Sequence, residues 1–195
     1  MILVTGATGH FGKAAIDFLL EKGVQPGAIS ALVRDEAKAS DIKEKGVSLR
    51  VGDYDNTESL KAAFKGVDKL LFISATDPEQ RARQHANVVA AAKEAGVKHI
   101  VYTSFERKNE TAASPIAFLS LTHLNTEKAI RESGMAYTIL RNNLYADVLP
   151  MFLGDKVLET GVYFPAGEAT AAFALRADMA EATANILTTV GSIPK

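Results

Sequence analysis

Apolar residues along this chain fall into short unbroken runs, which alternate with longer stretches where they recur every three or four positions. Unbroken runs are typical of strands buried on both faces of a sheet, and periodic stretches are typical of amphipathic helices. Glycine, proline, asparagine or aspartate separates most of these segments. The pattern predicts six strands, at residues 1–4, 29–33, 47–51, 69–75, 99–104 and 137–140.

Helix patterns lie between the predicted strands, so that the two kinds of segment alternate. One helix follows the first strand, and another opens at Asn56, whose side chain is suited to cap it. Longer helices are predicted at 77–95 and 115–134, and a last one begins at Asp178. This alternation favours an α/β fold in which a doubly wound parallel sheet, the Rossmann fold, carries helices on both faces.

A glycine-rich turn joins the first strand to the first helix, with glycines at positions 6, 9 and 12. The first N–H groups of a helix have no partner within the helix and lie at the positive end of its dipole, so they bind phosphate groups well. Glycine allows the phosphates to approach the backbone closely. The turn, with Thr8 as a small polar neighbour, predicts a dinucleotide site; a strand-to-helix turn without a ligand is the alternative.

The second strand ends at Arg34, at the position that faces the adenosine ribose in such a site. An acidic side chain there binds the 2′-hydroxyl of NAD, whereas arginine accommodates the 2′-phosphate of NADP. Asp35 follows directly and weakens the distinction, but Lys38 adds a second positive charge one turn later. We expect NADP(H) to be favoured over NAD(H), with a solvated charge at a strand end as the alternative for Arg34.

The ends of the third and fourth strands supply further candidates. Asp53 and Tyr54 follow the third strand, where an adenine ring can rest, although a capping turn without ligand contact explains either residue nearly as well. Ser74, Ala75 and Thr76 lie at the end of the fourth strand and are expected to border the cofactor. In the following helix, we assign His85 to packing or to an interface.

Composition narrows the function classes. The chain has 195 residues, 47% of them hydrophobic, and a net charge of −1, so it offers no electrostatic field for nucleic acid. It has no cysteine, and its four histidines lack metal-ligand spacing, so neither disulfides nor a metal site is expected. With no apolar run long enough to span a membrane and no signal peptide before the first strand, we expect a cytoplasmic protein. Any redox chemistry must come from a bound cofactor.

Six short motifs occur along nearly the whole chain: Thr5-Gly6-Ala7-Thr8-Gly9-x-x-Gly12, Val33-Arg34, Gly52-Asp53-Tyr54, Ala95-Gly96-Val97-Lys98-His99-Ile100, His123-x-x-Thr126-Glu127 and Leu140-Arg141-Asn142-x-x-Tyr145. In combination they resemble the NmrA-like branch of the atypical short-chain dehydrogenase/reductases. Within this branch, the chain is similar to the bacterial NADPH-dependent triphenylmethane dye reductases and NAD(P)H:quinone oxidoreductases.

The resemblance implies two groups of site residues. The expected cofactor-binding residues are in the glycine turn and at the ends of the strands that follow: Gly6, Thr8, Gly9, His10, Phe11, Gly12, Arg34, Lys38, Asp53, Tyr54, Ser74, Ala75, Thr103 and Ser104. The expected substrate-side residues include the start of the polar 105–114 loop: Phe105, His123, Asn142 and Tyr145.

One departure from the wider dehydrogenase superfamily is visible by counting. Those enzymes carry Tyr-x-x-x-Lys, in which lysine lowers the pKa of the tyrosine so that it can pass a proton to or from the substrate oxygen. None of the tyrosines here, at positions 54, 102, 137, 145 and 163, has a lysine four residues later. His123 and Glu127 lie on one face of the corresponding helix, but they are as well explained by a core histidine and a solvated acid. We therefore assign no catalytic residue.

The missing pair disfavours ordinary ketone reduction. A quinone or dye needs only hydride from the nicotinamide, because its reduced form is stabilised by delocalisation and takes a proton from water. The protein then supplies binding and orientation. We expect an NADPH-dependent reductase whose small-molecule electron acceptor is a quinone, dye or similar conjugated electrophile. The alternative is a non-catalytic regulator that senses NADP(H) and acts on a protein partner.

The segment after Tyr145 differs from the rest. We divide the chain into a dinucleotide-binding domain at 1–146 and a partial substrate-side lobe at 147–195, because the family continues beyond this point with further strands and helices. The chain is either naturally short or truncated. Apolar runs at 148–153, 161–165 and 171–174 would lack the cover of a complete lobe. We expect an open substrate site and self-association, as a dimer, through residues 152–187, with no membrane or nucleic-acid partner.

Overall fold

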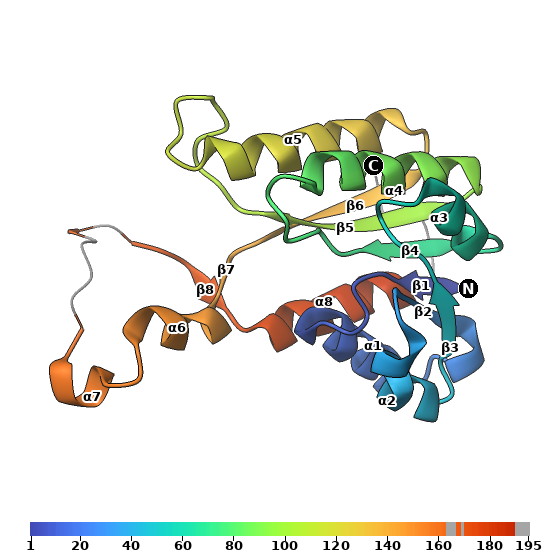
Figure 1. The fold of residues 1–195 in the computed structure, drawn as a ribbon, viewed down its shortest axis with the longest axis horizontal. Helices are drawn as coiled ribbons and strands as arrows, with labels where there is room; N and C mark the ends of the chain where they lie inside the picture. Colours follow the sequence, from blue (N-terminus) through green and yellow to red (C-terminus); the bar gives the residue numbers. More distant parts are fainter. Residues whose placement is uncertain (163–166, 169, 190–195) are drawn as a thin grey trace.

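A computed structural model describes residues 1–162, 167–168 and 170–189 of the chain. Its main element is a parallel sheet of six strands in the order β3-β2-β1-β4-β5-β6 (Figure 1). The sheet grows from β1 first in one direction and then in the other, which is the doubly wound arrangement, and the predicted fold class is confirmed. The strands are β1 (Ile2–Val4), β2 (Ile29–Val33), β3 (Ser48–Val51), β4 (Lys69–Phe72), β5 (His99–Phe105) and β6 (Ala136–Asn142).

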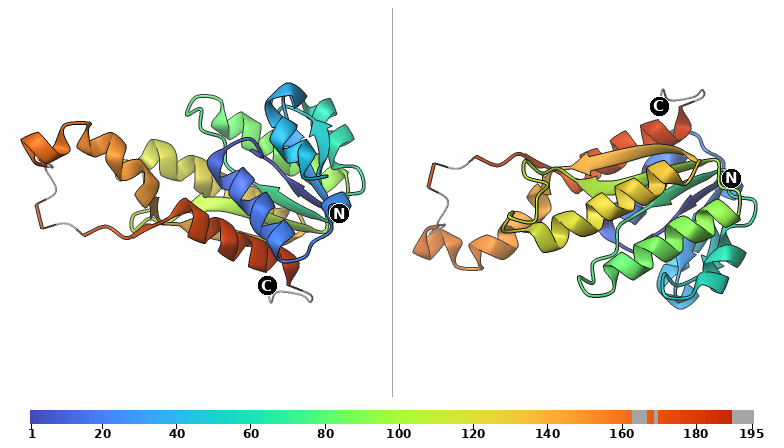
Figure 2. Two further views of the ribbon diagram at one scale, coloured as in Figure 1. Left: turned by 90° about the horizontal axis from the view of Figure 1, so that it is seen from below. Right: turned by 90° about the horizontal axis from the view of Figure 1, so that it is seen from above.

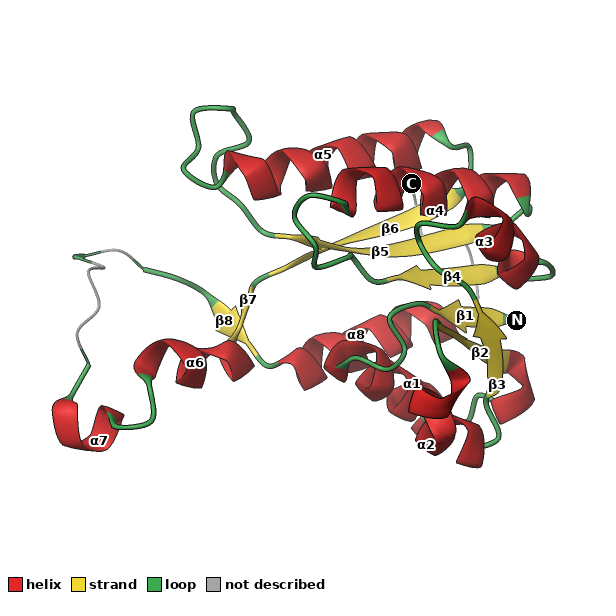
Figure 3. Ribbon diagram, in the orientation of Figure 1, coloured by secondary structure: helices red, strands yellow, loops and turns green. Residues whose placement is uncertain are grey.

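Helices cover both faces of the sheet (Figures 1 and 3). Successive residues of a strand point to opposite faces, so Ile2 and Val4 of β1 belong to one core and Leu3 belongs to the other. The first core contains residues from α1 (His10–Glu21), α2 (Ser40–Glu44) and α8 (Arg176–Thr188). The second core contains residues from α3 (Thr57–Phe64), α4 (Arg81–Glu94) and α5 (Ala117–Glu132).

The fourth strand ends three residues earlier than predicted. After Phe72 the backbone leaves the sheet, because the N–H of Ile73 donates to Thr5 Oγ1 at 2.9 Å and the N–H of Ser74 donates to Thr103 Oγ1 at 2.9 Å. Side-chain hydroxyls on the two neighbouring strands thus replace the ladder partners. Residues 73–75 consequently form an irregular segment at the carboxyl edge of the sheet.

The helix boundaries also differ from the prediction at three places. Helix α4 begins at Arg81 instead of residue 77, because the Asp77 carboxylate accepts from the N–H groups of residues 79 and 80 and forms a separate turn. Helix α5 begins at Ala117, two residues after the predicted start. Helix α8 begins at Arg176, whose N–H donates to Asp147 Oδ2 at 2.8 Å. The predicted cap is present, since Asn56 Oδ1 accepts from the N–H of Ser59.

Between β6 and α8 the chain projects beyond the end of the sheet (Figure 2). This projecting segment holds β7 (Leu144–Tyr145), α6 (Leu149–Leu153), α7 (Val157–Thr160) and β8 (Phe173–Ala174). Strands β7 and β8 pair in parallel at its base. Several of its apolar side chains are exposed, Met151 at 83% and Leu158 at 99%. The predicted run at 161–165 falls largely on residues 163–165, outside the described part of the chain.

Helix α8 returns from the projecting segment and packs beside α1 in the same layer (Figure 2). Its residues Ala180, Ala184 and Leu187 are buried in the first core. Because α1 covers these side chains, they are not available to a second molecule. Self-association and the domain boundary at residues 146–147 stay predictions. Of the range predicted for self-association, the projecting segment is the part whose apolar side chains are still exposed.

Two alanines of α8 provide a test of this packing. Ala184 is fully buried, whereas Ala182 on the same helix is exposed. We expect Ala184→Leu to lower the free energy of unfolding by about 1–3 kcal/mol, because the added atoms overfill a packed core. The matched control Ala182→Leu should stay within about 0.5 kcal/mol of the parent chain. Urea unfolding measures both, and equal stability of the two variants would contradict the packing of α8 on α1.

Candidate functional site

The turn between β1 and α1 depends on two of its glycines. Gly6 has a φ of +57°, in the left-handed region that favours glycine. A Cβ on Gly12 would lie 2.3 Å from the carbonyl oxygen of Gly6, so α1 approaches the turn more closely than any side chain permits. Gly9 precedes the helix in an extended conformation, without a side-chain cap, and His10 is exposed at the first helical position. The N–H groups of this first turn therefore face the turn without a side-chain partner.

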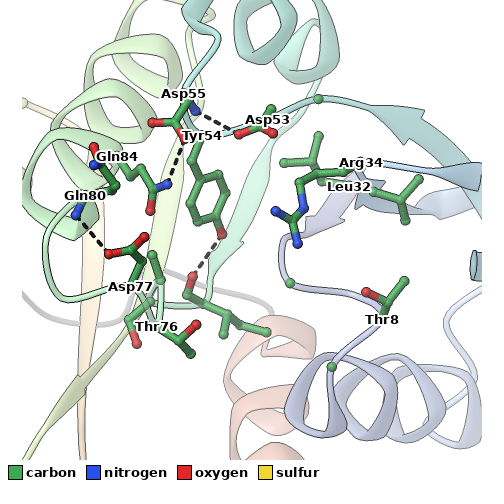
Figure 4. Close-up of a pocket in the computed structure, with 17 residues that line it drawn as sticks. Thr8, Leu32, Arg34, Asp53, Tyr54, Asp55, Thr76, Asp77, Gln80 and Gln84 are labelled. Carbon is green, nitrogen blue, oxygen red and sulfur yellow. Dashed lines mark hydrogen bonds between the residues drawn. The ribbon is translucent and has the colours of Figure 1, made fainter.

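A cavity of about 510 Å³ opens at the carboxyl edge of the sheet, beside this turn (Figure 4). It lies where the strand order reverses, between β1 and its neighbours β2 and β4. This is the position at which doubly wound sheets bind ligands. The cavity brings together most of the predicted cofactor-binding residues: Gly6, Thr8, Gly9, Arg34, Asp53, Tyr54, Ser74 and Ala75.

Arg34 lines the cavity and also a smaller hollow that it shares with Thr8, Asp35 and Lys38. Its side chain extends toward the cavity (Figure 4). The Asp35 carboxylate is directed to its own turn, where Oδ1 accepts from the N–H of Ala37 and caps a 3₁₀ helix. Within the described part of the chain, neither Arg34 nor Lys38 has an ion-pair partner. Two positive charges beside the glycine turn are thus left for a ligand.

Tyr54 lines the cavity with its side chain, and its hydroxyl is turned inward. The hydroxyl oxygen lies 2.9 Å from the carbonyl oxygen of Ile73 and also contacts the hydroxyl of Thr5. Burial raises the pKa of Tyr54, so the hydroxyl stays protonated. Asn87 from α4 donates to the Tyr54 carbonyl oxygen at 2.9 Å. Tyr54 therefore fixes the ends of β1 and β4 relative to each other, while its predicted contact with adenine stays a prediction.

Apart from Thr76, which was expected to border the cofactor, the wall opposite Arg34 was missed at the sequence level. Figure 4 shows Thr76, Asp77, Gln80 and Gln84 on that side. Gln84 is held in place by its hydrogen bond to Asp55 Oδ2 at 2.9 Å. Asp77 could have indicated this wall, because an aspartate just before a helix pattern is typical of a capping turn and not of a helix interior.

Two predicted cofactor-binding residues, Thr103 and Ser104, are buried behind the cavity wall. Thr103 Oγ1 accepts from the N–H of Ser74 at 2.9 Å and supports a residue that lines the cavity. Ser104 Oγ points the other way and donates to Glu127 Oε1 at 2.6 Å. Both side chains thus hold neighbouring parts of the site in place.

The four predicted substrate-side residues form one row. Phe105 and Asn142 are paired at the ends of β5 and β6. Asn142 Nδ2 donates to the Tyr145 hydroxyl at 3.3 Å, and the Tyr145 ring lies 6.4 Å from that of Phe11, at the start of α1. At the other end, the rings of Phe105 and His123 are 5.2 Å apart. The row therefore runs from the glycine turn to α5.

Glu127 is not the solvated acid that the sequence allowed; its side chain is fully buried. Its carboxylate oxygens lie 2.9 Å from Arg107, 3.1 Å from Arg131 and 3.0 Å from Arg141. Burial alone would raise the pKa of Glu127, but hydrogen bonds from Ser104, Arg141 and Arg107 lower the pKa to about 2. The ionised carboxylate joins the loop after β5 to α5 and β6.

Two histidines and a tyrosine form a second buried group. The Tyr102 hydroxyl lies 2.7 Å from His123 Nδ1 and 3.3 Å from His85 Nδ1. Burial lowers the pKa of His85 to about 3 and that of His123 to about 4, so both rings are neutral at pH 7. His85 is buried, as expected, and its Nε2 accepts from the N–H of Ala75 at 2.9 Å. This bond connects the group to the cavity wall.

The described residues also bear on metals and membranes. They contain no cluster of three or more histidine, aspartate or glutamate side chains arranged to hold a metal ion. Among the helices formed by these residues, none combines the length and apolar character that crossing a bilayer requires.

A six-stranded parallel sheet with a glycine turn and a cavity at the point of strand reversal defines a doubly wound domain of the Rossmann type. Sequence comparison makes the assignment specific. The chain belongs to the NmrA-like family, whose sequence model matches residues 1–193. The resemblance stated from the motifs is confirmed.

Several relatives are similar over almost the whole chain. The chain is 42% identical to quinone oxidoreductase 2 of Escherichia coli K12 over 192 residues, which cover 98% of this chain and 65% of the relative. It is 32% identical to the NAD(P)H azoreductase of Xenophilus azovorans, over 98% of this chain and 64% of the azoreductase. The crystal structure of Citrobacter sp. triphenylmethane reductase complexed with NADP(H) matches with a TM-score of 0.86 and 43% identity. The match covers 98% of this chain and 67% of the reductase chain. The chain thus spans about 65% of the length of the curated relatives named here.

The buried Glu127 cluster yields a stability prediction. We expect Glu127→Gln to lower the free energy of unfolding at pH 7 by about 3–5 kcal/mol, because Arg107, whose side chain is 1% exposed, loses its buried carboxylate partner. The matched control is Glu132→Gln on the same helix, where the carboxylate is 66% exposed. It should change stability by less than about 0.5 kcal/mol. Similar losses in the two variants, measured by urea unfolding, would contradict the role of the cluster.

The same cluster predicts a pH dependence. The pKa of Glu127 in the folded chain, about 2, lies below its ordinary value of 4.5, so its stabilising contribution is complete above pH 4.5 and is lost as pH falls toward 2. The stability difference between the parent chain and Glu127→Gln should therefore shrink across that window. Unfolding curves at a series of pH values measure it, and a constant difference would contradict the lowered pKa.

Proposed function

We propose that this chain binds NADP(H) and belongs to a reductase that passes hydride to a quinone, dye or similar conjugated acceptor. The observation that carries the proposal is the pair of unpartnered cations, Arg34 and Lys38, beside the uncapped start of α1. Helix N–H groups and glycine backbone suit a pyrophosphate, and the two cations suit a 2′-phosphate. The residues present therefore fit the cofactor that the motifs imply.

The relatives support the same cofactor and the same kind of acceptor. One structural neighbour is quinone oxidoreductase QOR2 of Escherichia coli complexed with NADPH, with a TM-score of 0.85 and 41% identity. Another is the triphenylmethane reductase complexed with NADP(H). The names of these proteins and of the azoreductase share one chemical feature, an acceptor with an extended conjugated system.

Within this proposal, the residues of the chain bind and orient the two reactants. A bound nicotinamide supplies the hydride. Arg34, Lys38 and the glycine turn hold the phosphates, while the row from Phe11 through Tyr145 and Asn142 to Phe105 borders the acceptor. No Tyr-x-x-x-Lys pair stands ready to protonate an alkoxide, and the Tyr102 hydroxyl is enclosed by two histidines. Neither kind of acceptor needs that proton donor: the negative charge formed on a reduced quinone is delocalised and takes a proton from water, and a triphenylmethane cation is neutralised by the hydride itself.

Oxidation of NADPH in the presence of menadione, an azo dye or a triphenylmethane dye tests the proposal. Steady turnover with at least one acceptor is the expected result. Tight binding of both oxidised and reduced cofactor without turnover on any of them would favour the alternative, a regulator that senses NADP(H). Failure to bind either form of the cofactor would overturn both functions.

Arg34 provides a test of the cofactor preference. A charged hydrogen bond to the 2′-phosphate is worth about 1.5–3 kcal/mol, so Arg34→Ala should weaken NADPH binding by about 10- to 100-fold and leave NADH binding almost unchanged. The control Lys65→Ala removes an exposed positive charge outside the cavity and should affect neither cofactor. Fluorescence titration measures the four dissociation constants. Equal weakening of NADPH and NADH would contradict the assignment of Arg34.

A further inference from the structure

The buried group of His85, Tyr102 and His123 has no part in hydride transfer as described above, yet it joins two parts of the site. At one end, His85 accepts from the N–H of Ala75, which lines the cavity. At the other end, the ring of His123 packs edge-on against Phe105 in the substrate-side row. The hydrogen bonds between these ends determine where each ring carries its hydrogen.

His85 is the fixed end of this group. A backbone N–H only donates, so Nε2 of His85 must be an acceptor, and in the neutral ring the hydrogen lies on Nδ1. Nδ1 is 2.9 Å from Thr126 Oγ1 and 3.3 Å from the Tyr102 hydroxyl. The Thr126 hydroxyl donates to the Thr122 carbonyl oxygen at 2.8 Å, so its oxygen is able to accept from His85.

Tyr102 transmits this orientation to His123. Because Nδ1 of His85 carries a hydrogen, it cannot accept from the Tyr102 hydroxyl, and the single hydrogen of Tyr102 is directed to Nδ1 of His123. The separation of 2.7 Å suits an O–H donor and is shorter than the usual N–H···O distance. His123 therefore accepts at Nδ1 and carries its hydrogen on Nε2, the opposite tautomer from His85.

The Nε2 atom of His123 has no hydrogen-bond partner among the described residues, where the fully buried polar side-chain atoms without a partner belong to Arg81, Arg107 and Ser120. Nε2 of His123 is therefore not completely enclosed, although His123 as a whole is only 5% exposed and its ring packs against Phe105. Burial, followed by the positive charges of Arg81 from α4 and Arg107 from the loop after β5, lowers the pKa of His123 to about 4. The Glu127 carboxylate from α5 raises the pKa but does not outweigh them, so the ring is neutral at pH 7.

We propose that Nε2–H of His123 donates a hydrogen bond to the electron acceptor and stabilises the negative charge that hydride transfer places on it. The proposal rests on the reductase function proposed above. The acceptor gains a hydride, NADPH is oxidised to NADP⁺, and the reduced anion takes its proton from water, so His123 keeps its own hydrogen. Tyr102 and His85 are positioning residues, because they fix the tautomer of His123.

This role distinguishes two classes of acceptor. Hydride addition to a quinone creates an oxyanion, which a preorganised N–H donor stabilises. Hydride addition to a triphenylmethane cation creates a neutral molecule, for which the donor offers little. His123 therefore favours acceptors that become anionic. The ratio of quinone to dye turnover reports this preference and is insensitive to general loss of active protein.

Kinetics with NADPH and two acceptors, menadione and malachite green, test the proposal. Since a hydrogen bond to a charged group contributes about 1.5–3 kcal/mol, His123→Phe should lower the menadione-to-malachite-green turnover ratio by about 10- to 100-fold. His123→Gln keeps an N–H donor and should restore part of the ratio. The control His99→Phe changes a histidine at the start of β5 and should leave the ratio unchanged. An unchanged ratio in His123→Phe would overturn the proposal.

Nitrogen-15 NMR of the histidine rings gives a readout that is independent of turnover. The chain has four histidines, so single substitutions assign the signals. The expected result is hydrogen on Nδ1 of His85 and on Nε2 of His123, with the preference at His123 lost in Tyr102→Phe. Hydrogen on Nδ1 of His123 would overturn the proposal even if the protein is an active reductase. Turnover of neither acceptor would instead overturn the proposed function, and the acceptor role of His123 would fall with it.

Discussion

The close approach of α1 to the turn before it is the constraint on which the rest of the site depends. With Gly12 almost touching the Gly6 carbonyl, the helix begins directly at the carboxyl edge of β1. Its position then determines three others: the cavity beside the turn, the contact of Phe11 with Tyr145, and the surface that α8 covers. A side chain at position 12 would move the helix outward and separate all three.

The far side of the site is organised by charge instead. The buried Glu127 carboxylate pairs with three arginines, one in the loop after β5, one in α5 and one in β6, so it holds these parts of the chain together. Such an arrangement costs desolvation, which is offset only because every charge has a partner. The cavity side of the domain thus relies on backbone geometry, and the substrate side relies on paired ions.

The sequence predicted correctly those features that one continuous segment determines by itself. Alternating runs predicted the sheet and its helices, and the glycine spacing predicted the turn. The errors arose where distant residues meet: Thr5 and Thr103 draw residues 73–74 out of β4, and Arg107 with Arg141 makes Glu127 a buried ion. Neither partnership has a local pattern. The tautomers of His85 and His123 were equally out of reach, because they follow from hydrogen bonds between three different elements.

Because α8 returns to the layer of α1, the segment between β7 and β8 leaves the domain and rejoins it at the same place. It is a loop closed at its base, where Leu144 pairs with Phe173 and the N–H of Arg176 binds Asp147. Because the entropy of closing such a loop grows only slowly with its length, residues can be added or exchanged there at small thermodynamic cost. The segment is therefore an insert whose length and sequence can change while the sheet and its cavity keep their geometry.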